Sequence, residues 1–76
     1  MNMINKLAQR LSALRTAQGL TRKGLADKAG IDYGAYNHYE HADRYMPVYA
    51  LDALCKALGT TPNVLMGYED IPTDQK

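Results

Sequence analysis

A phenol, an amide and an imidazole share one face of a predicted helix over residues 32–40. At about 100° per residue, this face carries Tyr33, Gly34, Asn37 and His38. The opposite face, which we expect to pack on the preceding helix, carries Ala35, Tyr36 and Tyr39. An amide can pair with adenine through two hydrogen bonds, and a small residue lets a helix approach a base or a thymine methyl closely. An ordinary polar surface would show the same residues, so helix spacing alone leaves both interpretations open.

A second candidate site lies at the start of the preceding helix, where Thr21 can act as the N-cap. Arg22 and Lys23 place positive charge at the positive end of the helix dipole, which costs about 0.3–1 kcal/mol per charge. Gly24 stands where a capping-box glutamate would go, and an interior glycine costs about 1 kcal/mol relative to alanine. A bound phosphate would offset the charge penalty, since free N–H groups and two cations would face it. The alternative is a frayed and solvated first turn.

Metal-binding and nucleophilic chemistry have little support. His38, Glu40, His41 and Asp43 are close in sequence, but a metal site needs three or four converging ligands with a supporting second shell. Cys55 has no paired base in the sequence, and a small buried thiol is the commoner role. No Gly-rich phosphate loop or catalytic triad is visible. We therefore expect no metal, no cofactor and no enzymatic activity.

The elements that must position these residues form two short helices joined by a tight turn, within residues 21–40. Leu25, Ala26 and Ala29 give the first helix a buried edge, and Gly30 supplies the left-handed residue that ends it. Asp32 can cap the second helix. Two helices joined by a short glycine-containing turn form a helix-turn-helix, whose second helix enters the DNA major groove.

The remaining chain predicts three further helices. An apolar stripe at spacings of three and four marks an amphipathic helix that ends near Gly19, and it is formed by Ile4, Leu7, Leu11 and Leu14. After a loop over residues 41–47, a helix over 48–58 has an inner face formed by Val48, Leu51, Leu54, Cys55 and Leu58. Thr61 and Pro62 start a last short helix. The fold class is therefore all-α, a five-helix bundle, with one domain over residues 1–67 and a polar, acidic, flexible tail over residues 68–76.

Composition and charge agree with this fold. The 76 residues are 46% hydrophobic, which is enough for one core. One cysteine excludes an internal disulfide and favours a reducing compartment. No apolar run could span a membrane and the start lacks a signal-peptide core, so we expect a cytoplasmic, nucleoid-associated protein. Seven Lys and Arg oppose four Asp and Glu up to residue 44, whereas two oppose four from residue 45 onward. Such a split lets one face meet phosphates.

Over residues 4–66 the chain resembles the phage repressor and Cro class of helix-turn-helix proteins, the xenobiotic-response-element family. The matching residues are RTAQGLTR from Arg15 to Arg22, Leu25-Ala26, Ala29-Gly30-Ile31, Tyr39-Glu40, Pro47, Leu51, Leu54, Ala57-Leu58-Gly59 and Leu65-Met66. The resemblance implies a lambda-repressor-like domain. It departs from the family at Tyr36 and Tyr39, where aliphatic residues are usual, so their hydroxyls are expected to reach the rim.

The resemblance also implies roles for individual residues. Base edges would be met by Tyr33, Gly34, Asn37 and His38. Phosphates would be met at the start of one helix and after the next, by Thr21, Arg22, Lys23, His41, Arg44 and Tyr45. Asp43 would repel a phosphate unless Arg44 neutralised it. A structural ion pair would join Arg15 and Glu40, and a dimer interface would include Val64, Met66 and Tyr68.

Two functions follow from these observations. The first is a sequence-specific transcriptional regulator, a homodimer in which each subunit reads one half-site of a double-stranded DNA operator. The alternative is an antitoxin or another protein-interaction module that keeps this fold and neutralises a partner protein. The acidic second half of the chain and the unusual recognition helix motivate that alternative.

Overall fold

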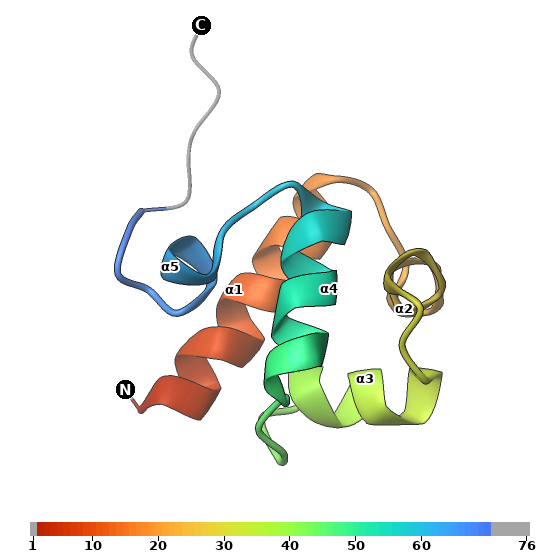
Figure 1. The fold of residues 1–76 in the computed structure, drawn as a ribbon, viewed down its shortest axis with the longest axis horizontal. Coiled ribbons are helices and arrows are strands. Elements are labelled where there is room, and N and C mark those ends of the chain that lie inside the picture. The colour runs from red at the N-terminus through yellow and green to blue at the C-terminus, as the bar shows by residue number, and fades with distance from the viewer. Residues whose placement is uncertain (1, 71–76) are drawn as a thin grey trace, which may run out of the picture.

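Five α-helices form one bundle in the computed structural model, which describes residues 2–70 (Figure 1). The helices are α1 (Met3–Ala17), α2 (Arg22–Ala29), α3 (Tyr33–Glu40), α4 (Val48–Leu58) and α5 (Pro62–Leu65). Helix α2 packs against α3 and α4, while α1 packs against α3 and α5. The all-α class and the number of helices agree with the sequence prediction. None of the described helices has the length and apolar character needed to cross a bilayer.

The predicted helix starts are confirmed by their hydrogen bonds. Thr21 Oγ1 accepts from the Gly24 amide at 2.9 Å, and Asp32 Oδ2 accepts from the Ala35 amide at 3.0 Å. A Cβ on residue 24 would lie 3.0 Å from this Thr21 hydroxyl. Glycine at this position therefore keeps the cap uncrowded, which gives a structural reason for a residue of low helix propensity.

The turn between α2 and α3 depends on Gly30. Its φ of +72° lies in the left-handed region, which a glycine adopts without steric cost. The amide of Ile31 then donates to the Ala26 carbonyl at 2.8 Å, which satisfies an acceptor at the end of α2. This geometry turns the chain so that α3 runs across the end of the bundle, beneath α2 in Figure 1.

The core contains Leu7, Leu11 and Leu14 of the stripe predicted on α1, together with residues of every other helix. Ile4, the first residue of that stripe, is only half-buried. Its fully buried large side chains are Leu11, Leu25, Tyr36, Leu54 and Leu65. The prediction that Val48 faces inward is wrong, because its side chain is 81% exposed. Ala50 takes the buried position instead, and it lies about 200° around the helix axis from Val48.

The end of α3 has an unusual backbone. Ala42 adopts a φ of +63°. Every other residue with a left-handed backbone among residues 2–70 is a glycine. The chain then folds back, so that the Asp43 amide donates to the His38 carbonyl at 3.2 Å. Asp43 is thereby held over the last turn of α3.

Residues 68–70 belong to the described part of the chain, and residues 71–76 of the expected tail lie outside it. The amides of Tyr68 and Glu69 both donate to the Asn63 carbonyl, at 2.8 and 3.2 Å. Arg10 Nη1 donates to the carbonyls of Val64 and Glu69, at 3.1 and 3.0 Å. These contacts attach the segment after α5 to α1. The flexible tail, with its boundary after residue 67, stays a prediction.

Replacing Ala42 with glycine is expected to stabilise the fold. A left-handed conformation costs an L-residue about 1–2 kcal/mol, and glycine avoids this cost while losing more backbone entropy on folding. A42G should therefore raise the free energy of unfolding by about 0.5–1 kcal/mol in urea denaturation. The control is A13G at an exposed position within α1, which should lower it by about 1 kcal/mol. A loss of stability in both variants would contradict the assigned backbone conformation.

Candidate nucleic-acid interface

The two faces of α3 differ as the helix spacing predicts. On one face Tyr36 is fully buried and Tyr39 is 4% exposed. On the other face Tyr33 is 42% exposed, and Gly34 and His38 are exposed as well. Three of the four predicted base-reading residues therefore present their side chains or backbone to solvent.

Asn37 is the exception on this face. It is only half-exposed, and its Oδ1 atom is enclosed without a hydrogen-bond partner. A buried polar atom without a partner costs about 1–3 kcal/mol. A two-bond contact with adenine needs both Oδ1 and Nδ2, so Asn37 would have to rotate before it could make that contact.

The carboxylate of Glu40 is the centre of the polar network beneath this surface. Arg15 donates to it twice, from Nε at 2.9 Å and from Nη2 at 3.0 Å. The Tyr36 hydroxyl donates to Oε2, and Arg22 Nε donates to Oε1 at 3.0 Å. The predicted pairing of Arg15 with Glu40 is thus present in the structure. The Tyr36 hydroxyl was expected to reach the rim, but it bonds to this carboxylate.

Burial and hydrogen bonding act in opposite directions on Glu40. Its side chain is only 5% exposed, and this burial alone would raise its pKa. The hydrogen bonds from Arg15, Tyr36 and Arg22 outweigh the burial, so the pKa of Glu40 lies below its ordinary value. Burial, followed by the bond to Glu40, raises the pKa of the Tyr36 hydroxyl far above its usual range. The network is therefore an ionised carboxylate that accepts from neutral and cationic donors.

Arg22 takes part in this network, which sequence reasoning did not foresee. It was expected to face a phosphate, but in the structure it contacts Glu40 from the start of α2. Its side chain is still 45% exposed, and Glu40 keeps three other donors if Arg22 leaves. No periodicity links residues 22 and 40, so only the tertiary fold shows this contact.

The other predicted phosphate ligands at the start of α2 are on the surface. Thr21 is exposed and caps the helix through its hydroxyl. Lys23 pairs with Asp27 one turn later at 2.9 Å, with both side chains 63% exposed. Such an exposed pair contributes little to stability, so Lys23 can exchange it for another anion. The first turn of α2 contains no acidic residue.

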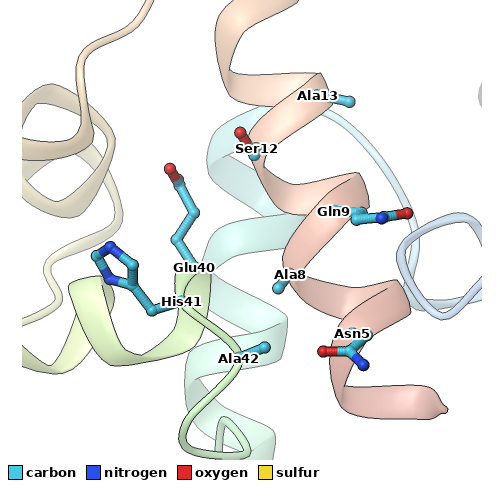
Figure 2. Close-up of a pocket in the computed structure, with 8 residues that line it drawn as sticks. All are labelled: Asn5, Ala8, Gln9, Ser12, Ala13, Glu40, His41 and Ala42. Carbon is cyan, nitrogen blue, oxygen red and sulfur yellow. The ribbon is translucent and has the colours of Figure 1, made fainter. Parts of the chain in front are cut away.

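The loop after α3 supplies the remaining predicted phosphate ligands. Arg44 and Tyr45 are exposed, with Tyr45 at 56%. His41 is also exposed, and its Nδ1 lies 2.7 Å from the Asn37 carbonyl. Figure 2 shows a groove between α1 and the end of α3, with Glu40 and His41 on one side. His41 therefore lies against α3 and borders this groove.

The sequence left open whether Arg44 neutralises Asp43. In the structure the Asp43 carboxylate contacts His38, with Oδ1 2.8 Å from Nδ1. The contact spans five residues, and it forms because the chain reverses at Ala42.

The predicted dimer residues do not share one environment. Val64 is 4% exposed and belongs to the core, so its inclusion in a surface was wrong. It faces inward because the short α5 anchors itself through Val64 and Leu65. Met66 is half-buried, and Tyr68 is 68% exposed. Tyr49 at 72% and Val48 are further exposed apolar side chains, which the sequence interpretation had not assigned to a surface.

Cys55 is buried in the core, and burial raises the pKa of its thiol. Within residues 2–70, no three His, Cys, Asp or Glu side chains gather closely enough to hold a metal ion. The geometry instead presents an exposed helix face beside two groups of cations.

A helix-turn-helix domain family matches residues 6–65, which is most of the chain. The chain belongs to this helix-turn-helix family. None of the curated proteins matches it. Among solved structures, the restriction-modification controller protein C.AhdI from Aeromonas hydrophila is 34% identical, with a TM-score of 0.77. That similarity covers 82% of this chain and 94% of the controller protein.

Two more distant structures support the fold alone. The hypothetical transcription factor NHTF from Neisseria is 20% identical over 86% of this chain and 75% of its own, with a TM-score of 0.81. The wild-type restriction-modification controller protein C.Esp1396I is 20% identical over 90% of this chain and 88% of its own, with a TM-score of 0.77. This helix-turn-helix protein is a DNA-binding transcriptional regulator of the xenobiotic-response-element type.

Replacing Glu40 with glutamine should strongly destabilise this helix-turn-helix protein. The substitution leaves Arg15, which is 12% exposed, without its counter-charge, and removing one partner of a buried pair costs about 3–5 kcal/mol. Urea denaturation measures the loss. D52N breaks an exposed pair with Lys56 and should cost less than about 1 kcal/mol. Equal effects in the two variants would show that the Glu40 network contributes no more than a surface pair.

The lowered pKa of Glu40 also predicts a pH dependence. Ionised Glu40 stabilises the fold fully above the ordinary pKa of a glutamate, and this contribution is lost as pH falls through the lower folded-state value. The wild-type protein should therefore lose stability progressively below about pH 5. E40Q should show a shallower slope over the same acidic range in denaturation curves. Parallel slopes would mean that Glu40 has the same pKa folded and unfolded.

Proposed function

We propose that this regulator binds an operator as a homodimer, with each subunit placing α3 in the major groove of one half-site. The observation that carries this proposal is the division of α3 into a buried tyrosine face and an exposed polar face. A helix docked by one face and free on the other can enter a groove about 12 Å wide. Tyr33, Gly34 and His38 would meet base edges directly, and Asn37 would join them after its amide rotates.

Phosphate contacts would flank this helix on both sides. The first turn of α2 offers backbone amides and the cations Arg22 and Lys23. That turn contains no acidic residue. The loop after α3 offers His41, Arg44 and Tyr45, all of them exposed. Arg22 would exchange Glu40 for a phosphate, and Arg15 and Tyr36 would keep the carboxylate satisfied.

A homodimer is proposed because one domain of this size makes few DNA contacts. Tyr68 and Met66 lie after α5 on a segment that Arg10 attaches to α1. An exposed aromatic side chain on a fixed segment is suited to an interface. The 34% identical relative is a restriction-modification controller, which supports the same kind of regulation for this protein.

R22A should weaken binding to every DNA sequence by a similar factor, about 5- to 10-fold, and reduce the dependence of log affinity on log salt by about one unit. Binding would be measured by fluorescence anisotropy at several salt concentrations. The matched control is K28A, which removes the same charge at the other end of α2 and should change affinity less. Binding of wild-type protein that does not depend on salt, together with capture of a partner protein, would instead support the protein-interaction function.

Replacing Tyr68 with aspartate should shift the protein toward monomer in sedimentation equilibrium, because a buried unpaired charge opposes association. The apparent dimer dissociation constant should rise about 10-fold or more. Y33D alters an exposed tyrosine on α3 and should leave self-association unchanged while weakening DNA binding. Unchanged association in Y68D would place the interface elsewhere on the surface.

A further inference from the structure

The contact between His38 and Asp43 lies on the face of α3 that the proposed function assigns to base reading. Asp43 Oδ1 is 2.8 Å from His38 Nδ1. Both side chains are about half-exposed, at 47% for His38 and 57% for Asp43. An isolated surface contact of this kind adds little stability. The main effect of this contact is therefore on the orientation of the His38 imidazole.

The backbone holds Asp43 in place for this contact. The left-handed Ala42 reverses the chain, and the Asp43 amide donates to the His38 carbonyl at 3.2 Å. The same residue therefore contacts His38 through both its main chain and its side chain. The main-chain bond keeps the Asp43 backbone beside His38, so that its carboxylate stays within hydrogen-bond reach of the imidazole.

The chemistry of the carboxylate determines which ring nitrogen carries the proton. An ionised carboxylate only accepts hydrogen bonds, so Nδ1 must donate. In a neutral imidazole the other nitrogen then carries the lone pair and accepts. Among residues 2–70 no group forms a hydrogen bond with Nε2 of His38. This nitrogen is left as an oriented acceptor.

We propose that Asp43 is a specificity-determining positioning residue, which fixes His38 so that Nε2 accepts a hydrogen bond from a base in the major groove. The bases that offer a donor there are adenine, through N6, and cytosine, through N4. Guanine and thymine present acceptors, which the lone pair of Nε2 would repel. This inference rests on the proposed function, since it assumes that α3 enters the major groove. It assigns Asp43 a role in base preference although Asp43 itself touches no base.

The test compares base preference in wild type, D43A and D43N, by selection from a randomised operator pool at alkaline pH. Wild-type protein should prefer adenine or cytosine at one position of each half-site. D43A should reduce that preference by about 5-fold or more, because one oriented base contact is lost. D43N keeps an oxygen that can accept from Nδ1, so it should retain the preference within about 2-fold.

A double-mutant cycle separates positioning from a general structural effect. H38A should abolish the preference at the same position, and D43A should cause no further change in the H38A background. An unchanged preference in D43A, with the preference lost in H38A, would overturn the role of Asp43 while leaving the proposed function intact. Absence of any sequence-selective binding in wild type would instead overturn the proposed function, and the inference with it.

The tautomer can also be measured without DNA. Nitrogen-15 NMR of the imidazole should show the proton on Nδ1 in wild type and D43N, and a shift toward Nε2 in D43A. A proton on Nε2 in the wild-type protein would overturn the inference directly. This measurement stays decisive even where a variant binds DNA too weakly for selection.

Discussion

The buried carboxylate of Glu40 joins three helices of the bundle, α1, α2 and α3. It lies at the end of α3 and accepts from Arg15 on α1, from Arg22 at the start of α2 and from Tyr36 within α3. The hydrophobic core places these helices side by side, but hydrophobic contact is not directional. The two hydrogen bonds from Arg15 to this carboxylate fix the end of α3 relative to α1. Arg22 adds an exposed contact from the start of α2, next to the exposed face of α3.

The network also resolves a conflict between folding and binding. Cations at the start of α2 are unfavourable for the helix, but the proposed function gives them a role as phosphate contacts. Arg22 is neutralised by Glu40, and Lys23 is neutralised by Asp27. Both pairs are exposed on the cationic side, so each cation can change partners at small cost. Asp43 is another acidic residue near the surface, and its carboxylate contacts the His38 imidazole.

Much of this fold could be predicted from local patterns. Thr21, Gly30 and Asp32 fixed the limits of α2 and α3, because caps and left-handed turns depend on neighbouring residues. The angular division of α3 also followed from spacing alone. The contact of Arg22 with Glu40, the enclosed amide oxygen of Asn37 and the exposure of Val48 could not be predicted, because each depends on which helix lies opposite. The prediction that Val64 lies in a surface was wrong for the same reason.

The bonds of Arg10 have a consequence for how two subunits could span DNA. Its guanidinium joins α1 to the carbonyls of Val64 and Glu69, so the segment bearing Tyr68 moves with the bundle. In the proposed dimer, no flexible segment then lies between α3 and the dimer interface. The two α3 helices would therefore be held at a fixed separation. Operators whose half-sites are one base pair closer or farther apart would have to twist or bend to be bound, and they would be rejected by the cost of that deformation.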